Sequence, residues 1–213
     1  MTHKTEVVLK MLAPYLAVGI FWIGLSRAWP AILAYHAQIL FWYLHHRHSS
    51  GSRDSTRRQR ERQSLGKYKH IFYNILIISV LPFTTILVYQ LVPFMIRTDL
   101  SAWLKGYHLS RYSFLLLIPY FGLVHPVLEQ LHWTPLRERM PILAHLLFAG
   151  YHVLVLFSLL SLPWLLMSFG VLYLASVVWG EATRRVGSPV PAIVSHALAD
   201  SGIILAVWLL VAR

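Results

Sequence analysis

The stretch that decides the fold is Val124–Thr134, V-H-P-V-L-E-Q-L-H-W-T, at the end of a long apolar run. Within it, Glu129 is the only acidic residue between Asp99 and Glu138. If this run spans a bilayer, a carboxylate inside it costs several kcal/mol unless it is paired or has a function. The sequence therefore makes Glu129 a candidate functional residue, and the side chains that could pair with it are candidates as well.

The composition around this stretch is that of a membrane protein. Hydrophobic residues make up 57% of the 213 residues, charged residues only 13%, and the mean hydropathy is +0.57. Soluble domains carry about 25% charged residues. The apolar residues occur in runs long enough to cross a hydrocarbon core about 30 Å thick. The chain has no cysteine, which excludes disulfides, thiolate zinc sites and a cysteine nucleophile.

We predict an all-α, polytopic membrane protein with about seven transmembrane helices and an active site between the last four. The predicted helices cover 8–26, 28–44, 71–95, 112–133, 141–161, 164–180 and 189–211. The first range is interpreted as a retained span, because Leu25-Ser26-Arg27 does not resemble a signal-peptide cleavage site. Residues 1–111 form the N-terminal part of this prediction, and residues 112–213 form its catalytic core.

The one long polar segment, residues 45–70, contains eight Lys and Arg residues. Cytoplasmic loops of membrane proteins carry an excess of these residues. With this loop inside, alternation of the helices also places the N-terminus and the loops 134–140 and 181–188 in the cytoplasm, which accounts for 14 of the 19 Lys and Arg residues. The arginine-rich cluster lacks interleaved aromatic residues, so we favour contact with membrane lipid or topology determination over nucleic-acid binding.

Three polar residues of the fourth predicted helix share one helix face. His125, Glu129 and His132 are spaced i, i+4 and i+7. The structural alternative is a set of side chains that extends into the lipid head groups, and it applies most to His132 beside Trp133. We predict that His125 and His132 support a site at Glu129.

The fifth and seventh predicted helices supply further polar residues. His152 lies 11 residues past Pro141, about 16 Å along the helix and near the bilayer midplane, with Phe148 one turn before it. A single histidine at this depth is often only a helix–helix hydrogen bond. His196 and Asp200 lie one turn apart on one face of the last helix, and packing alone explains such a pair less well.

We predict that Glu129, His152 and His196 converge on one polar cavity open to the cytosol. A carboxylate beside a histidine can take a proton from water, and a second histidine with a nearby acid can stabilise the oxyanion that forms. The alternative is a zinc site of His152, His196 and Glu129, because a His₂Glu set leaves a position open for water. The helical H-E-x-x-H pair is absent, so we favour hydrolysis without a metal.

Three blocks of sequence carry a resemblance to a known family. E-Q-L-H-W-T, F-A-G-Y-H and H-A-L-A-D, in this order between Glu129 and Asp200, resemble the motifs EExxxR, FxxxH and HxxxN or HxxxD of the CPBP family. This is the CAAX protease and bacteriocin-processing family of intramembrane proteases, which includes the CAAX endopeptidases. The resemblance covers roughly residues 112–211, and the segment G-E-A-T-R-R-V-G-S-P before the third block is similar to a loop of the same family.

The resemblance implies a role for each matching residue. Glu129 matches the family's water-activating base, and His152 matches the histidine that assists it. His196 and Asp200 match the third motif, which stabilises the tetrahedral intermediate, and Phe148 matches the first position of the second motif. The family is regarded as glutamate-dependent, which favours the absence of a metal.

The first motif departs from the family pattern at two positions. Gln130 stands where a second Glu is expected, and Thr134 stands where an Arg is expected. Losing both members of an ion pair together leaves no isolated charge in a low dielectric. Arg137 lies one turn later and is a candidate replacement. Because Glu129 is retained, we expect an active, divergent member.

Two other functions are weighed against the protease. A catalytically degenerate membrane scaffold or immunity protein is motivated by Gln130 and Thr134. A transporter with a proton relay is motivated by the buried histidines and acids, but the chain lacks the internal repeat of most transporters. We expect a peptide or membrane-protein substrate, location in a bacterial cytoplasmic membrane, and a cytoplasmic N-terminus.

Overall fold

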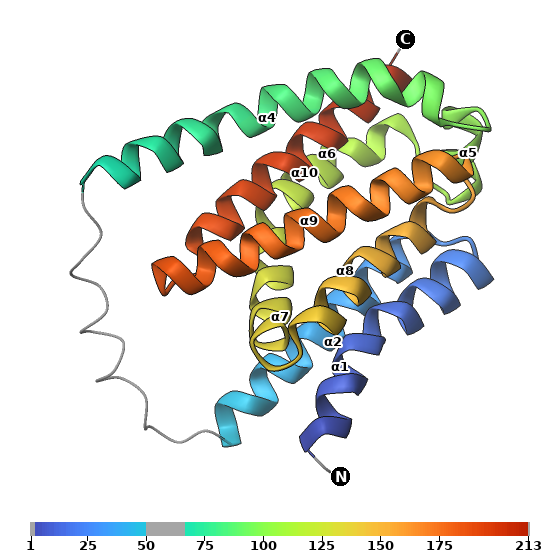
Figure 1. Ribbon diagram of the computed structural model, residues 1–213. Helices are drawn as coiled ribbons and strands as arrows, with labels where there is room; N and C mark the ends of the chain where they lie inside the picture. The colour runs from blue at the N-terminus through green and yellow to red at the C-terminus, as the bar shows by residue number, and fades with distance from the viewer. Residues whose placement is uncertain (1–2, 50–66, 213) are drawn as a thin grey trace.

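The computed structural model describes the backbone of residues 3–49 and 67–212 and the side chains of residues 5–45 and 80–212. Most of the predicted basic loop 45–70 lies outside the described residues, so its contacts stay a prediction. The described chain is helical, with one isolated backbone bridge between Ile96 and Leu160 and no strand (Figure 1).

The helices follow one another with short connections. Their bounds are α1 (His3–Ala17), the π-helical η1 (Val18–Gly24), α2 (Ala28–Ser49), α4 (Lys67–Met95), α5 (Leu100–Gly106), the 3₁₀ turn η3 (Arg111–Ser113), α6 (Phe114–Pro119), the π-helical η4 (Tyr120–Val124), α7 (His125–Arg139), α8 (Pro141–Leu156), α9 (Leu162–Val186) and α10 (Val190–Val211).

Four stretches of the described chain are long and apolar enough to cross a membrane. They are Thr5–Gly24, Arg111–Arg139, Leu162–Val186 and Val190–Val211. Val80–Met95 and Pro141–Leu156 are apolar but shorter. The prediction of an all-α integral membrane protein is confirmed at this level. Each of the seven predicted ranges contains a helix, but seven spans are not confirmed.

The helix ends differ from the prediction where side chains find partners. α7 continues through the predicted loop 134–140 to Arg139, because Leu136 and Arg137 in its last turns are buried. α8 ends at Leu156, well before the predicted residue 161. The following residues bond instead to the end of α4, with the Arg97 N–H donating to the Leu159 carbonyl.

α4 and α10 pack closely along their lengths (Figure 1). Gly202 of α10 makes this approach possible. A Cβ atom at this position would lie 2.1 Å from Thr84 Oγ1 and 2.8 Å from the Leu81 carbonyl oxygen. Small residues at such crossings let two membrane helices pack backbone against backbone.

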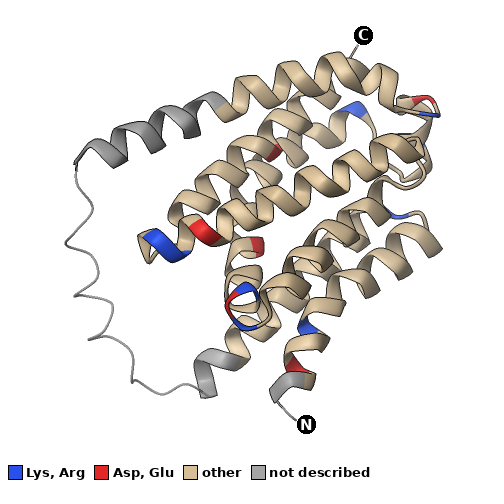
Figure 2. Cartoon of the chain, in the orientation of Figure 1, with Lys and Arg blue, Asp and Glu red and all other residues tan. Residues whose placement is uncertain are grey.

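α7 lies at the centre of the bundle and contacts α2, α8, α9 and α10. α2 therefore reaches the same central space as the last helices, although we predicted a site formed by the last four helices alone. The reason is tertiary: the packing of α2 against α7 joins segments that are far apart in the chain. Lys and Arg lie mostly at helix ends and in connections, as Figure 2 shows.

Candidate active site

Glu129 is fully buried at the centre of the bundle. The hydroxyls of Tyr35 on α2 and Tyr151 on α8 both donate to its Oε1 atom. Trp133 Nε1–H, one turn further along α7, donates to the Tyr35 hydroxyl at 3.0 Å. Hydrogen bonds to an ionised group are stronger than those between neutral groups. Oε1 is therefore held in place by side chains from two other helices.

The other oxygen of Glu129 has no hydrogen-bond donor among the described residues. Oε2 lies 3.7 Å from His125 Nε2 and 3.7 Å from His196 Nε2. Polar atoms at this distance are commonly bridged by a water molecule. One oxygen of the carboxylate is thus fixed, and the other faces two imidazole nitrogens.

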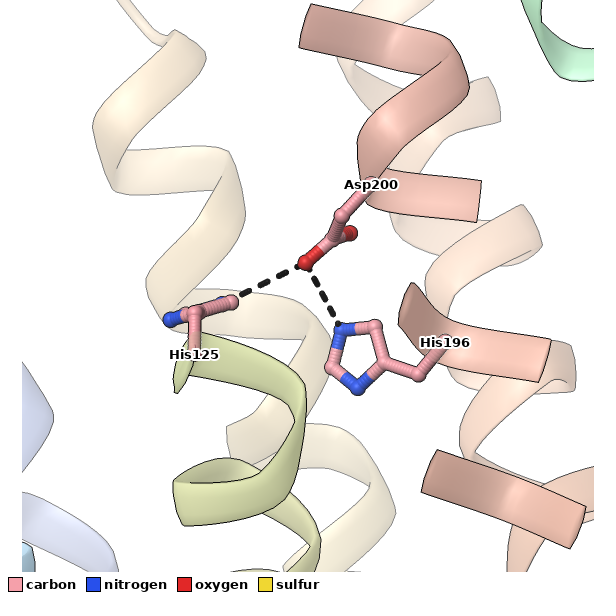
Figure 3. A group of neighbouring side chains, drawn as sticks. All are labelled: His125, His196 and Asp200. Atoms are coloured by element: carbon pink, nitrogen blue, oxygen red, sulfur yellow. Dashed lines mark ion pairs between the residues drawn. The ribbon is translucent and has the colours of Figure 1, made fainter. Parts of the chain in front are cut away.

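Asp200 faces the same two imidazoles from α10. Its Oδ2 atom lies 3.3 Å from His196 Nε2 and 3.7 Å from His125 Nε2, as the dashed lines of Figure 3 show. The Asp200 side chain is 16% exposed, while Glu129 is inaccessible. The predicted i, i+4 pair of His196 and Asp200 thus points toward α7 and Glu129.

Gln130 fixes the position of the hydrogen on His196. Arg137 Nη1 donates to Gln130 Oε1 at 2.8 Å, which leaves the Gln130 amide nitrogen 3.2 Å from His196 Nδ1. An amide NH₂ only donates, so Nδ1 of His196 accepts and neutral His196 carries its hydrogen on Nε2. This N–H points toward the two carboxylates. Arg137 is itself buried, and its Nε atom donates to Ser176 Oγ at 2.9 Å.

His152 reaches Glu129 through Tyr151 rather than directly. Its Nδ1 atom lies 2.8 Å from the Phe148 carbonyl oxygen, to which it donates, and its Nε2 atom lies 3.0 Å from the Tyr151 hydroxyl. When Tyr151 donates its single hydrogen to Glu129, its oxygen can accept from Nε2 only if His152 is protonated on both nitrogens. The protonation of His152 and the Tyr151–Glu129 bond are therefore coupled.

Aromatic rings enclose these polar groups. Trp179 stacks on His196 with ring centroids 4.3 Å apart, and Trp133 lies parallel to Tyr151. Phe148 is fully buried and contacts the rings of both His152 and His196. Such apolar walls lower the local dielectric and strengthen the interactions between the charged groups inside.

One predicted supporting residue lies away from the site. His132 is buried, but its Nε2 atom bonds to the Lys10 carbonyl oxygen of α1 at 3.2 Å. An i+7 spacing covers nearly two turns, and the face of α7 there meets α1 instead of α10. The interpretation of His132 as a group reaching the lipid head groups does not hold either, because the residue is 6% exposed.

Three residues that hydrogen-bond within the site were not predicted from the sequence: Tyr35, His36 and Tyr151. Tyr35 and His36 are adjacent polar residues in the middle of the apolar range 28–44, and Tyr151 directly precedes His152. A pair of polar residues in a predicted membrane helix was the available signal. It could not show which helix the pair would face, because that depends on the packing of α2 against α7.

The side chains do not fit a metal that uses His196. Ligand atoms of His125, His196 and Asp200 lie within 4.8 Å of one another (Figure 3), and His152 is not part of this group. A metal on His196 Nε2 would move the hydrogen of that ring to Nδ1, where it would face the hydrogens of the Gln130 amide. Turning the amide over would place its NH₂ against Arg137. The zinc alternative is therefore disfavoured by the donor set itself.

A comparison of the chain with protein-family models, curated proteins and solved structures finds no match. The geometry of the buried cluster therefore carries the functional argument.

Proposed function

We propose that this protein is a glutamate-dependent intramembrane endopeptidase, a divergent relative of the CPBP proteases, that cleaves a peptide bond near the cytoplasmic membrane face. The observation that carries the proposal is the asymmetric Glu129 carboxylate. Two tyrosines hold Oε1, while Oε2 faces His125 and His196 without a donor among the described residues. An oriented, buried base with one free oxygen is suited to take a proton from water.

The proposed reaction begins with a water molecule that hydrogen-bonds to Glu129 Oε2. The carboxylate takes one proton from this water while the water oxygen forms a bond to the carbonyl carbon of the substrate. His196 Nε2–H faces Asp200 Oδ2 before the reaction and donates to the oxyanion as it forms. The C–N bond then breaks, and Glu129 returns the proton to the leaving amine.

His152 assists the base through the Tyr151 hydroxyl. When His152 Nε2 carries a proton, the Tyr151 hydroxyl accepts a hydrogen bond from His152 while it donates one to Glu129, and this bond stabilises the ionised carboxylate before the reaction. This differs from direct assistance, but it assigns the residues of the first two motif-like blocks to one hydrogen-bonded chain.

The departures from the first family motif are compatible with activity. Arg137 bonds to Gln130, so an amide and a guanidinium occupy the place of the expected acid and base pair. Gln130 in turn keeps the hydrogen of His196 on Nε2, where the oxyanion needs a donor. The proposed substrate is a peptide or membrane protein, and we propose a bacterial cytoplasmic membrane with the N-terminus in the cytoplasm.

The test compares the membrane proteins of cells that produce the wild-type protein or a Glu129→Gln variant. New protein N-termini are identified by mass spectrometry, and a peptide covering the cleaved bond is then assayed with the purified proteins in liposomes. We expect Glu129→Gln to lower kcat by at least a hundredfold, as is typical when a general base is lost.

The matched control is Glu138→Gln, the same change at an exposed acid of the same helix. It is expected to leave cleavage unchanged. Cleavage that persists in Glu129→Gln at the wild-type rate would reject the protease. A cellular phenotype that survives in Glu129→Gln would favour the scaffold or immunity function instead.

A further inference from the structure

His36 on α2 lies outside all three motif-like blocks, yet it contacts the site. It is 4% exposed, and its Nε2 atom lies 2.9 Å from His125 Nδ1. The two rings meet edge to face, with centroids 5.0 Å apart and planes at 84°. The 2.9 Å contact joins one ring nitrogen of each histidine, so one of these two nitrogens carries the shared hydrogen.

The other nitrogen of His36 decides which one carries it. His36 Nδ1 lies 2.8 Å from the Ile32 carbonyl oxygen, and Tyr120 on η4 places its hydroxyl 2.8 Å from the same atom. A carbonyl oxygen only accepts, so Nδ1 of His36 carries the hydrogen and Nε2 of neutral His36 is an acceptor. The hydrogen between the two rings therefore belongs to His125 Nδ1.

We propose that His36 is a positioning residue that keeps His125 protonated at Nδ1 and so confines proton exchange on His125 to Nε2. That nitrogen lies 3.7 Å from Glu129 Oε2 and 3.7 Å from Asp200 Oδ2. The contact of His36 on α2 with His125 thus directs an exchangeable nitrogen toward the reacting water. The tautomer follows from the hydrogen bonds alone, whereas its catalytic consequence rests on the proposed protease function.

The direct test is ¹⁵N NMR of the imidazole nitrogens in protein labelled with [¹⁵N]histidine and reconstituted in lipid nanodiscs. The His125 signals are assigned by their loss in His125→Gln. We expect a protonated Nδ1 in the wild-type protein. In His36→Ala the acceptor is gone, and we expect the Nε2–H tautomer of His125 to become the major neutral form.

Two variants make the test specific. The amide oxygen of His36→Gln reaches about as far as the imidazole Nε2 and is expected to retain the wild-type tautomer. The amide of His36→Asn reaches only as far as Nδ1, so this variant is expected to behave like His36→Ala. It replaces His36→Ala in the NMR experiment if that variant does not fold. His45→Ala, at an exposed histidine of the same helix, is the matched control.

A wild-type His125 with its hydrogen on Nε2, or an unchanged tautomer in both His36→Ala and His36→Asn, would overturn the proposal. If cleavage is established, His36→Ala is expected to lower kcat about tenfold with little change in KM, and His36→Gln to recover most of it, since one hydrogen bond is at stake. If Glu129→Gln still cleaves, the protease proposal fails while the NMR result stands, so the two failures are distinguishable.

Discussion

The two oxygens of Glu129 have different surroundings, and this difference determines which oxygen can accept a proton. Tyr35 and Tyr151 bind one oxygen, and His125 and His196 face the other. A carboxylate with no donors would be too costly to bury, and one with donors on both oxygens would have little remaining capacity to accept a proton. The tyrosines therefore make burial tolerable while leaving the reactive oxygen free.

Replacing either tyrosine by phenylalanine tests this division. Tyr35→Phe removes a donor from Glu129 and leaves Trp133 Nε1 without its acceptor, and Tyr151→Phe removes a donor and leaves His152 Nε2 without its partner. We therefore expect a comparable loss of stability in the two variants. A hydrogen bond to a charged group contributes about 2 kcal/mol. Thermal unfolding in detergent should show a lower midpoint for both variants.

Tyr112→Phe is the control, because Tyr112 is 65% exposed and its hydroxyl accepts from the exposed Arg111. Its unfolding midpoint should match the wild-type value, since an exposed hydrogen bond contributes little to stability. Equal midpoints for Tyr35→Phe and Tyr112→Phe would show that the Tyr35 hydroxyl contributes no net stability to the buried carboxylate.

At the scale of the helices, the contact between α4 and α10 depends on the absence of one side chain. Gly202→Ala places a Cβ atom too close to the backbone of Leu81 as well as to Thr84, and a backbone atom cannot move aside cheaply. We expect a loss of about 2 kcal/mol, the usual cost of an overpacked contact. Thermal unfolding in detergent measures it.

Gly170→Ala in α9 is the matched control, because a Cβ atom there meets nothing within 4 Å. Alanine favours a helix more than glycine does, so this variant should be as stable as the wild-type protein or slightly more stable. An equal effect of both substitutions would mean that the close approach of α4 and α10 does not limit stability.

The sequence was informative where a polar residue interrupts an apolar run. Glu129, His196 and Asp200 could be selected in this way because burying an ionisable group in a membrane helix costs free energy unless the group is paired or has a function. The same reasoning did not select Tyr35 or Tyr151, since tyrosine is common in membrane helices and its hydroxyl is weakly polar. Arg137 was a candidate only, because its helix was expected to end before it.

At the scale of the molecule, we predict that the two ends of the bundle face opposite sides of the membrane. The C-terminal ends of α7 and α9 lie on one side, and α5 and the C-terminus lie on the other (Figure 1). The excess of Lys and Arg in the predicted cytoplasmic segments predicts that the first of these ends is cytoplasmic. Residue 139 should then be cytoplasmic and residue 105 should face away from the cytoplasm.

The lack of cysteine makes this orientation directly measurable. Lys105→Cys and Arg139→Cys each introduce a single thiol at an exposed position. A membrane-impermeant maleimide added to intact bacterial cells should label Lys105→Cys strongly and Arg139→Cys only after the cells are opened. The reverse pattern would require the opposite orientation.

The bond between Tyr35 and Glu129 links the beginning of the chain to its middle, and it has a consequence for synthesis. Chains are made from the N-terminus, so α2 is synthesised before α7 leaves the ribosome. The Tyr35 hydroxyl is therefore already present when Glu129 enters the lipid, so Glu129 can form this hydrogen bond at once. A circularly permuted chain in which α2 is translated last should therefore insert α7 poorly and be degraded.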